Sequence, residues 1–134
     1  MSVRSAIARL LVLVLAVAVG VAGCTNSAVG LSGDYREDTL KVVDALERAI
    51  DTPDSDPQKE ALQERARQQI DEYIALYRRD EDVSGLRSFT TMRTALNTLA
   101  GHYSGKTQRP VPDEVKERLK RKFAQVRSAL QRNS

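Results

Sequence analysis

The chain has 134 residues, a formal net charge of +3, a single histidine and a single cysteine. Zinc and most transition-metal sites need several such ligands, so this composition excludes them. One cysteine also excludes an intramolecular disulfide, and a core with no tryptophan, two phenylalanines and four tyrosines must be mostly aliphatic. An aliphatic core of this kind favours helices over a β-sandwich.

The N-terminal residues have the pattern of a secretory signal peptide, predicted over residues 1–23. Two arginines precede an apolar run over residues 10–22, which is shorter than the about 20 residues that a membrane span needs. The small residues Val21-Ala22-Gly23 then lead into Cys24, an order that resembles the lipobox of bacterial lipoproteins. That resemblance implies cleavage before Cys24 and acylation of its sulfur. The alternative is an ordinary signal peptide followed by a chance cysteine.

The composition changes after the cleavage position. Residues 24–33 are the cysteine that the lipobox resemblance implies is lipidated, followed by residues 25–33, whose Ser, Gly, Asn and Ala predict a flexible tether. Removal of the leader takes away two arginines, so the formal net charge falls from +3 to +1. This near-neutral balance gives no indication of nucleic-acid binding. Residues 34–134 are long enough for one domain with one core.

The first half of the exported chain predicts two amphipathic helices. One is expected over Tyr35–Asp51 with Asp34 as its N-cap. The other is expected over Pro57–Arg78, with Asp56 as its N-cap and Pro57 as its first helical residue. Apolar spacing of three or four predicts these core residues: Leu40, Val43, Leu46 and Ile50, then Leu62, Ala66, Ile70, Tyr73 and Tyr77, with Ile74 and Leu76 widening the second stripe.

The second half predicts two more helices. One is expected from Ser88 or Phe89 to Tyr103, after an acidic loop, and the last from Pro112 to Gln131, after a loop that contains glycine. Their expected core residues are Phe89, Met92, Leu96, Leu99 and Tyr103, then Val115, Leu119, Phe123, Val126 and Leu130. Four helices joined by loops of under about ten residues predict an all-α fold, an up-down-up-down four-helix bundle.

Charged residues are unevenly distributed along the exported chain. Residues 34–82 hold fifteen acidic and eight basic side chains, and residues 108–134 hold three acidic and eight basic ones. Residues 83–107 hold three basic side chains and no acidic one. Acidic and basic helices could lie side by side and neutralise each other. Alternatively, separate acidic and basic faces could meet the aqueous loops of a membrane protein or anionic headgroups.

The residue pattern does not support an enzyme. His102 is the single histidine and lies at the end of a predicted helix, and no serine has the surroundings of a nucleophile. The acidic loop from Asp80 to Gly85 has the opening spacing of an EF-hand, but Thr91 stands where the closing bidentate glutamate is required. We therefore expect no catalytic residue, no metal site and no cofactor.

The third predicted helix is polar for a member of a bundle. Four threonines, an asparagine and a Gly-His-Tyr end lower its helix propensity, so something other than propensity selects them. The sequence around it reads Ser84-Gly85-Leu86, Ser88-Phe89-Thr90-Thr91-Met92-Arg93-Thr94-Ala95-Leu96-Asn97, Leu99-Ala100-Gly101-His102-Tyr103-Ser104 and Arg109-Pro110-Val111-Pro112. Further motifs are Gly33-Asp34-Tyr35-x-x-Asp38-Thr39, Tyr73 through Tyr77-Arg78-Arg79-Asp80 and the closing basic helix. In this order they closely resemble the small lumenal photosystem II assembly lipoproteins of cyanobacteria and their chloroplast relatives.

The resemblance covers essentially the whole exported chain and implies a lipid-anchored bundle at the lumenal face of the thylakoid membrane. It also implies transient association with photosystem II assembly intermediates, on the large lumenal loop of the inner-antenna chlorophyll protein, during assembly and repair. By the same resemblance, the client complexes have an immature manganese–calcium cluster, and the chain itself is no catalyst and carries no chlorophyll or manganese. We expect a monomer without a nucleic-acid partner.

The expected functional residues follow from these motifs. Cys24 is the expected lipidation site, and the candidate partner-binding residues are Asp80, Asp82, Arg93, His102, Tyr103, Arg109 and Pro110. Two rival functions stay open at this point. One is a generic exported lipoprotein whose helical bundle binds another partner or a ligand, and the other is metal sensing or delivery through the acidic loops.

Overall fold

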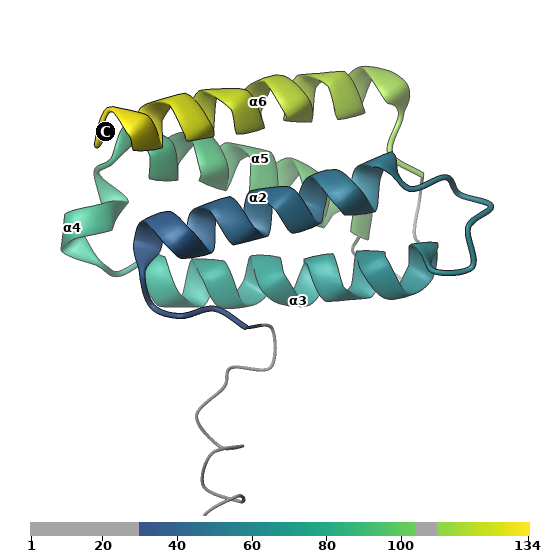
Figure 1. Ribbon diagram of the computed structural model, residues 1–134, viewed down its shortest axis with the longest axis horizontal. Coiled ribbons are helices and arrows are strands. Elements are labelled where there is room, and N and C mark those ends of the chain that lie inside the picture. The colour runs from purple at the N-terminus through teal and green to yellow at the C-terminus, as the bar shows by residue number, and fades with distance from the viewer. Residues whose placement is uncertain (1–29, 104–109) are drawn as a thin grey trace, which may run out of the picture. The chain divides into compact units, whose positions relative to one another are not determined.

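The computed structural model describes residues 30–103 and 110–134, whose regular secondary structure is helical (Figure 1). The helices are α2 over Tyr35–Asp51, α3 over Lys59–Tyr77, α4 over Glu81–Ser84, α5 over Arg87–Tyr103 and α6 over Asp113–Gln131. The leader, Cys24, most of the predicted tether and Arg109 lie outside the described residues. Within the described part, none of the helices has the length and apolar character needed to cross a membrane.

The four long helices form an antiparallel bundle. Helix α2 packs chiefly on α3 and α5 chiefly on α6, while contacts of α3 with α5 and of α2 with α6 close the ring. Figure 1 shows that successive long helices run in alternate directions. The predicted all-α up-down-up-down bundle is confirmed. The short helix α4 lies within the segment that was predicted as an acidic loop, at the end of the bundle where α3 ends and α5 begins.

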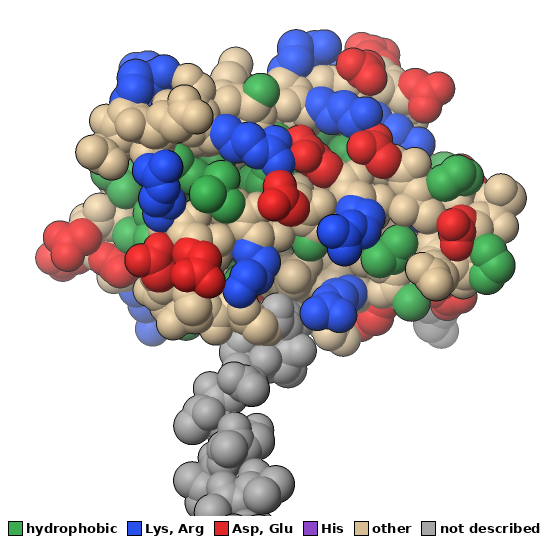
Figure 2. Space-filling model, viewed as in Figure 1, with side chains coloured by type: hydrophobic (Ala, Val, Ile, Leu, Met, Phe, Trp, Pro, Cys, Tyr) green, Lys and Arg blue, Asp and Glu red, His purple; other side chains and the backbone are tan. Residues whose placement is uncertain are grey.

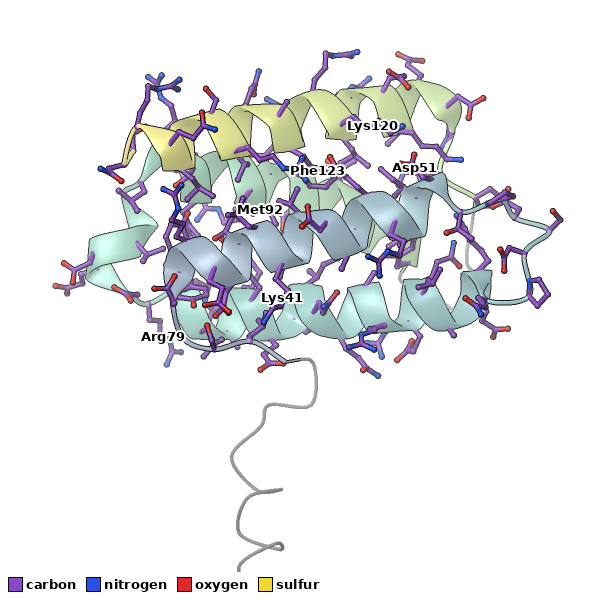
Figure 3. All side chains as sticks on the ribbon, in the orientation of Figure 1. Lys41, Asp51, Arg79, Met92, Lys120 and Phe123 are labelled. Carbon is purple, nitrogen blue, oxygen red and sulfur yellow. The ribbon has the colours of Figure 1, made fainter. Side chains whose placement is uncertain are left out.

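The core of the bundle is mostly aliphatic, and a cluster of aromatic rings lies at one end. Met92 of α5 and Phe123 of α6 are fully buried and point inward between the helices (Figure 3). At the end where α2 begins, four rings pack together with centroids 5.1 to 6.5 Å apart, and they belong to Tyr35, Tyr73, Tyr77 and Phe89. Tilted and edge-on ring pairs at such distances stabilise a fold beyond the area they bury.

The predicted core stripes are confirmed on all four long helices, with particular exceptions. Val42 and Ala49 were not predicted but are fully buried, because α2 contacts both α3 and α6 and its buried face is wider than one stripe. Leu76 was expected to widen the apolar side of α3, and this is wrong, since its side chain is 45% exposed. Four other predicted core residues are only half-buried: Leu40, Leu62, Ile74 and Val115.

The predicted start of α3 is wrong by two residues. Pro57 was expected as the first helical residue after an Asp56 cap, but α3 begins at Lys59 and its N-cap is Gln58. The Asp56 carboxylate instead accepts a hydrogen bond from the Gln58 N–H at 2.8 Å, and its carbonyl accepts one from the Lys59 N–H at 3.0 Å. Asp56 therefore stabilises a separate turn that precedes the helix.

The other boundaries lie within two residues of the prediction. The predicted N-cap of α2 is confirmed, because the Asp34 carboxylate accepts a hydrogen bond from the Glu37 N–H at 2.8 Å. Helix α5 begins at Arg87, one residue before Ser88 and two before Phe89, the two predicted starts. Pro112 was expected to be the first residue of the last helix, but its extended backbone, with ψ at 149°, makes it the N-cap of α6.

The compact unit begins at Leu31, within the segment predicted as a tether. The Leu31 side chain is 8% exposed, and the N–H groups of Ser32 and Gly33 donate to the Asp38 carboxylate at 2.7 and 2.9 Å. Gly33 has a φ of +88°, a conformation that residues with a Cβ rarely adopt, so the turn into α2 favours glycine. Residues 31–33 therefore pack with the bundle.

Candidate partner-binding surface

Five of the seven predicted partner-binding residues lie at two opposite ends of the bundle, whereas Arg93 lies within α5 and Arg109 lies outside the described residues. Asp80 and Asp82 flank the start of α4, whereas His102, Tyr103 and Pro110 lie where α5 ends and α6 approaches (Figure 1). Because α5 has 17 residues at a rise of about 1.5 Å each, roughly 25 Å separates the two groups. The structure does not bring them together into one site.

The acidic pair at the α4 end has a local structural role. Asp80 is the N-cap of α4, and its Oδ1 accepts a hydrogen bond from the Asp82 N–H at 3.0 Å. Both residues are exposed, so they present negative charge to solvent at this end of the bundle. Within residues 30–103 and 110–134, no group of three or more His, Cys, Asp or Glu side chains is placed to hold a metal ion.

Tyr103 is a core residue, so its assignment to a surface for partners is wrong. It follows Leu99 on the apolar stripe of α5, its side chain is 2% exposed, and burial raises the pKa of its hydroxyl to about 12. That hydroxyl has no hydrogen-bond partner among the described residues. His102 is half-buried in the last turn of α5, where an imidazole suits the negative end of the helix dipole. Pro110 is exposed.

Arg93 lies on the exposed face of α5, which also carries a row of threonines. The hydroxyls of Thr90, Thr94 and Thr98 donate to the carbonyl oxygens four residues earlier, at 3.2, 3.0 and 3.1 Å. These bonds satisfy the hydroxyls within the helix at a small cost in helix stability. The outer face of α5 is therefore polar and, apart from its arginines, uncharged.

Helices α2 and α6 face each other with opposite charges. Arg127 donates to Glu47 at 2.8 and 2.9 Å and to Asp44 at 2.6 Å, and the hydrogen bonds to Glu47 raise the pKa of its guanidinium. Lys120 pairs with Asp51 at 2.7 Å, and Figure 3 shows the two side chains between α6 and α2. On the face that Figure 2 shows, Lys and Arg side chains alternate with Asp and Glu. Side-by-side neutralisation is confirmed for these two helices.

The side of the bundle that α5 and α6 form is basic and is not neutralised in this way. Helix α5 contains no Asp or Glu, and the acidic residues of α6 lie in its first half. Arg87, Arg121 and Arg132 are exposed, and none of them forms an ion pair with a carboxylate of the described residues. A groove of about 530 Å³ runs along this side and is lined by Arg87, Thr91, Ala124, Gln125, Ser128 and Arg132.

Sequence reasoning did not predict this groove. The one signal available was the absence of acidic residues from 83 to 107. Helix pairing was not known from the sequence, so nothing indicated that the start of α5 and the end of α6 would lie together.

A buried carboxylate near the start of α2 was also missed. Asp38 is fully buried and accepts hydrogen bonds from Ser32, from the Gly33 N–H and, at 2.5 Å, from the Tyr77 hydroxyl. Burial by itself would raise the pKa of Asp38, but these hydrogen bonds together hold it below its ordinary value. Asp38 thereby joins residues 32–33, α2 and the end of α3.

A buried lysine has a similar role at the other end of α2. The Lys59 amine donates to the carbonyl oxygens of Ala49 and Thr52 at 2.7 and 2.6 Å. Burial lowers the pKa of this amine, while Asp54 at 3.9 Å opposes the effect. Lys59 therefore caps the C-terminal end of α2 from the neighbouring helix.

A family model described as Photosystem II Pbs27 matches residues 1–130. This chain belongs to that family. The Photosystem II lipoprotein Psb27 of Synechocystis sp. is 46% identical over 129 residues, which are 96% of each chain. The Photosystem II assembly factor lipoprotein Psb27 of Thermosynechococcus vestitus is 47% identical over 122 residues, 91% of each chain. The Photosystem II repair protein PSB27-H1, chloroplastic, of Arabidopsis thaliana is 27% identical over 100 residues, 74% of this chain and 58% of that protein.

Solved structures of the family have the same fold. The solution structure of Psb27 from cyanobacterial photosystem II has a TM-score of 0.75 at 45% identity, and the match covers 82% of this chain and 96% of that one. The crystal structure of PSB27 from Arabidopsis thaliana has a TM-score of 0.71 at 26% identity, covering 75% and 99%. The family resemblance seen in the sequence is confirmed. The relatives are named as a lipoprotein, an assembly factor and a repair protein. Membership of this family confirms the expectation that the protein is not an enzyme.

Proposed function

We propose that this chain is an assembly and repair factor of photosystem II. The observation that carries the proposal is family membership over nearly the whole length, since a relative named as a photosystem II assembly factor aligns over 91% of both chains. The rival reading, a generic exported lipoprotein, is supported by no comparable observation.

The proposed location is the lumenal side of the thylakoid membrane, with Cys24 as the lipid anchor. The order of basic, apolar and small residues before Cys24 supports export and acylation. Two cyanobacterial relatives are named as lipoproteins, which supports the same anchor. A lipid anchor raises the local concentration of the bundle at the membrane, so that a weak interface can suffice.

The proposed client surface is the large lumenal loop of the inner-antenna chlorophyll protein, before the manganese–calcium cluster matures. An assembly factor that must dissociate again is expected to use a small, polar interface. The bundle surface supports this, because Leu76 is the one large apolar side chain that is exposed among the described residues. Its other exposed residues are mainly charged, small or polar.

Co-purification tests this function. A tagged full-length chain should retain photosystem II subunits when solubilised thylakoids are passed over it. The variant Arg93→Glu should retain less of them at unchanged helical content, because Arg93 is exposed on α5 and its reversal puts negative charge on a face without acidic residues.

The matched control is Arg65→Glu on α3, which makes the same charge change at another exposed position. Absence of photosystem II from the wild-type eluate would favour the generic lipoprotein. Equal retention by both variants would remove Arg93 from the interface.

A further inference from the structure

The groove between α5 and α6 combines guanidinium groups with neutral hydrogen-bonding groups. Arg87 is the first residue of α5 and Arg132 follows the last residue of α6. Because the two helices are antiparallel, both arginines lie at the same end of the pair. Thr91 and Ser128 supply hydroxyls beside them, and Gln125 supplies an amide. A volume of about 530 Å³ accommodates several amino-acid side chains or a short stretch of extended chain.

The two arginines keep donors available for a ligand. Arg132 uses Nη1 to donate to the Ser128 hydroxyl at 2.6 Å, and no ion pair joins it or Arg87 to a carboxylate of the described residues. By contrast, Arg127 on the α2 side of the same helix is held by two carboxylates. A guanidinium presents a planar fork of donors that matches a carboxylate, so two guanidinium groups without a described carboxylate partner can pair with an anionic ligand in this groove.

The surroundings of the groove extend its positive charge. Arg121 lies four positions before Gln125 and shares its face of α6, and Arg121 likewise has no carboxylate partner among the described residues. The nearest acidic residues along α6 are Glu114 and Glu117, at the other end of the helix, and Glu114 is paired with Arg118. A ligand with several negative charges therefore meets three arginines without a described carboxylate partner on this side of the bundle, and the exposed acidic residues at the same end, Asp80, Glu81 and Asp82, belong to the segment before α5 and do not line the groove.

We propose that this groove binds an acidic polypeptide segment of a partner protein, with Arg87 and Arg132 pairing with its carboxylates. Thr91, Gln125 and Ser128 then hydrogen-bond its backbone. A polypeptide fits better than a membrane surface for two reasons. The site is hollowed rather than flat, and the described residues expose a single large apolar side chain, Leu76, which belongs to α3 and not to α5 or α6. This proposal does not depend on the partner being a subunit of photosystem II.

A direct binding measurement tests the site. A fluorescently labelled octaglutamate peptide is titrated with the full-length chain in an uncharged detergent at low ionic strength, and its anisotropy is followed. The double variant Arg87→Gln/Arg132→Gln should bind the peptide at least about tenfold more weakly, since two charge-assisted contacts are lost.

The control double variant, Arg65→Gln/Arg79→Gln, removes the same net charge from exposed positions on and after α3, and Figure 3 shows Arg79 away from α6. Its affinity should change by less than about twofold. Amide NMR shifts should concentrate on Thr91, Gln125 and Ser128. Circular dichroism and urea titration confirm that each variant is folded.

Two results would overturn the site. Equal weakening by both double variants would show that the peptide responds to net charge and not to the groove. The second concerns the membrane: vesicles of phosphatidylcholine with phosphatidylglycerol are compared with pure phosphatidylcholine vesicles. The chain could bind the anionic vesicles more tightly than the neutral ones. If that extra binding requires Arg87 and Arg132, and if the peptide does not compete with it, the lipid headgroup is the ligand and the proposal is wrong. The peptide assay contains no photosystem, so its failure leaves the proposed function untouched.

Discussion

Asp38 is a fully buried carboxylate that stays ionised because of the donors around it. The N–H groups of Ser32 and Gly33, the Ser32 hydroxyl and the Tyr77 hydroxyl all donate to its oxygens. Its pKa in the folded protein is lower than in the unfolded chain, so the folded state gains stability from it above pH 4. This contribution disappears as the pH falls through the lowered pKa of the folded state.

The variant Asp38→Asn should therefore destabilise the bundle at neutral pH by about 2 to 3 kcal/mol. The substitution replaces one acceptor oxygen of the carboxylate with an NH₂ group, which then faces groups that are themselves hydrogen-bond donors. Urea unfolding measures the change. Asp71→Asn, which weakens only an exposed pair with Arg67, should cost below about 0.5 kcal/mol. The wild type should lose stability below about pH 4 more steeply than Asp38→Asn. Parallel pH profiles for the two proteins would refute this role.

Tyr103 and Tyr73 offer a matched pair of buried hydroxyls. Thr39 donates its own proton to the Tyr35 carbonyl at 2.6 Å, so Tyr73 must donate in the 2.8 Å bond to Thr39. Tyr73→Phe should therefore cost about 1 kcal/mol. Tyr103→Phe should be neutral or stabilising, because its hydroxyl has no partner within residues 30–103 and 110–134. A loss at Tyr103→Phe as large as at Tyr73→Phe, measured by thermal unfolding, would show that the Tyr103 hydroxyl is bonded.

At the level of helices, opposite charges help to hold α6 against α2. Arg127→Met removes a guanidinium that bridges Glu47 and Asp44, and it should destabilise the bundle by about 1 kcal/mol. The loss should shrink in 1 M salt, which screens exposed ion pairs. Arg121→Met on the same helix removes a charge without a described carboxylate partner and should have an effect below about 0.5 kcal/mol in urea unfolding. Equal effects of the two variants would argue against pairing between these helices.

Helix positions followed from local signals where such signals were unambiguous. Helix α2 was predicted with its observed bounds, because Asp34 caps it and the Thr52-Pro53 step ends it. The start of α3 was missed because the Asp56 side chain caps a turn as readily as a helix. The four residues of α4 are too few to carry a helical period.

The candidate site was harder to predict than the helices, since it depends on contacts between distant segments. Tyr103 continues the apolar stripe through Leu99, and this periodicity was a better guide than its place in a polar motif. The Asp38 bond to Tyr77 joins residues 39 positions apart. Neither that bond nor the groove between Arg87 and Arg132 can be read before the helix pairing is known.

At the level of the whole molecule, tethering and recognition are assigned to different parts of the chain. The core is built from Leu31 onward, and we assign the lipid anchor to Cys24. Cys24→Ser should therefore move the protein from the membrane to the soluble fraction, while the far-ultraviolet circular dichroism of the bundle stays the same. Membrane retention of the serine variant after a salt wash would refute the anchor, and loss of helical signal would refute the separation of the two roles.

We propose that this chain binds photosystem II during assembly and not after it. The most direct measurement separates solubilised thylakoid complexes by native electrophoresis and quantifies the full-length chain in each band by immunodetection. We expect the chain to accompany complexes that lack a mature manganese–calcium cluster and to be depleted from oxygen-evolving ones. An equal amount of the chain per photosystem II in mature and immature complexes, or its absence from both, would show that it does not act as an assembly-stage factor.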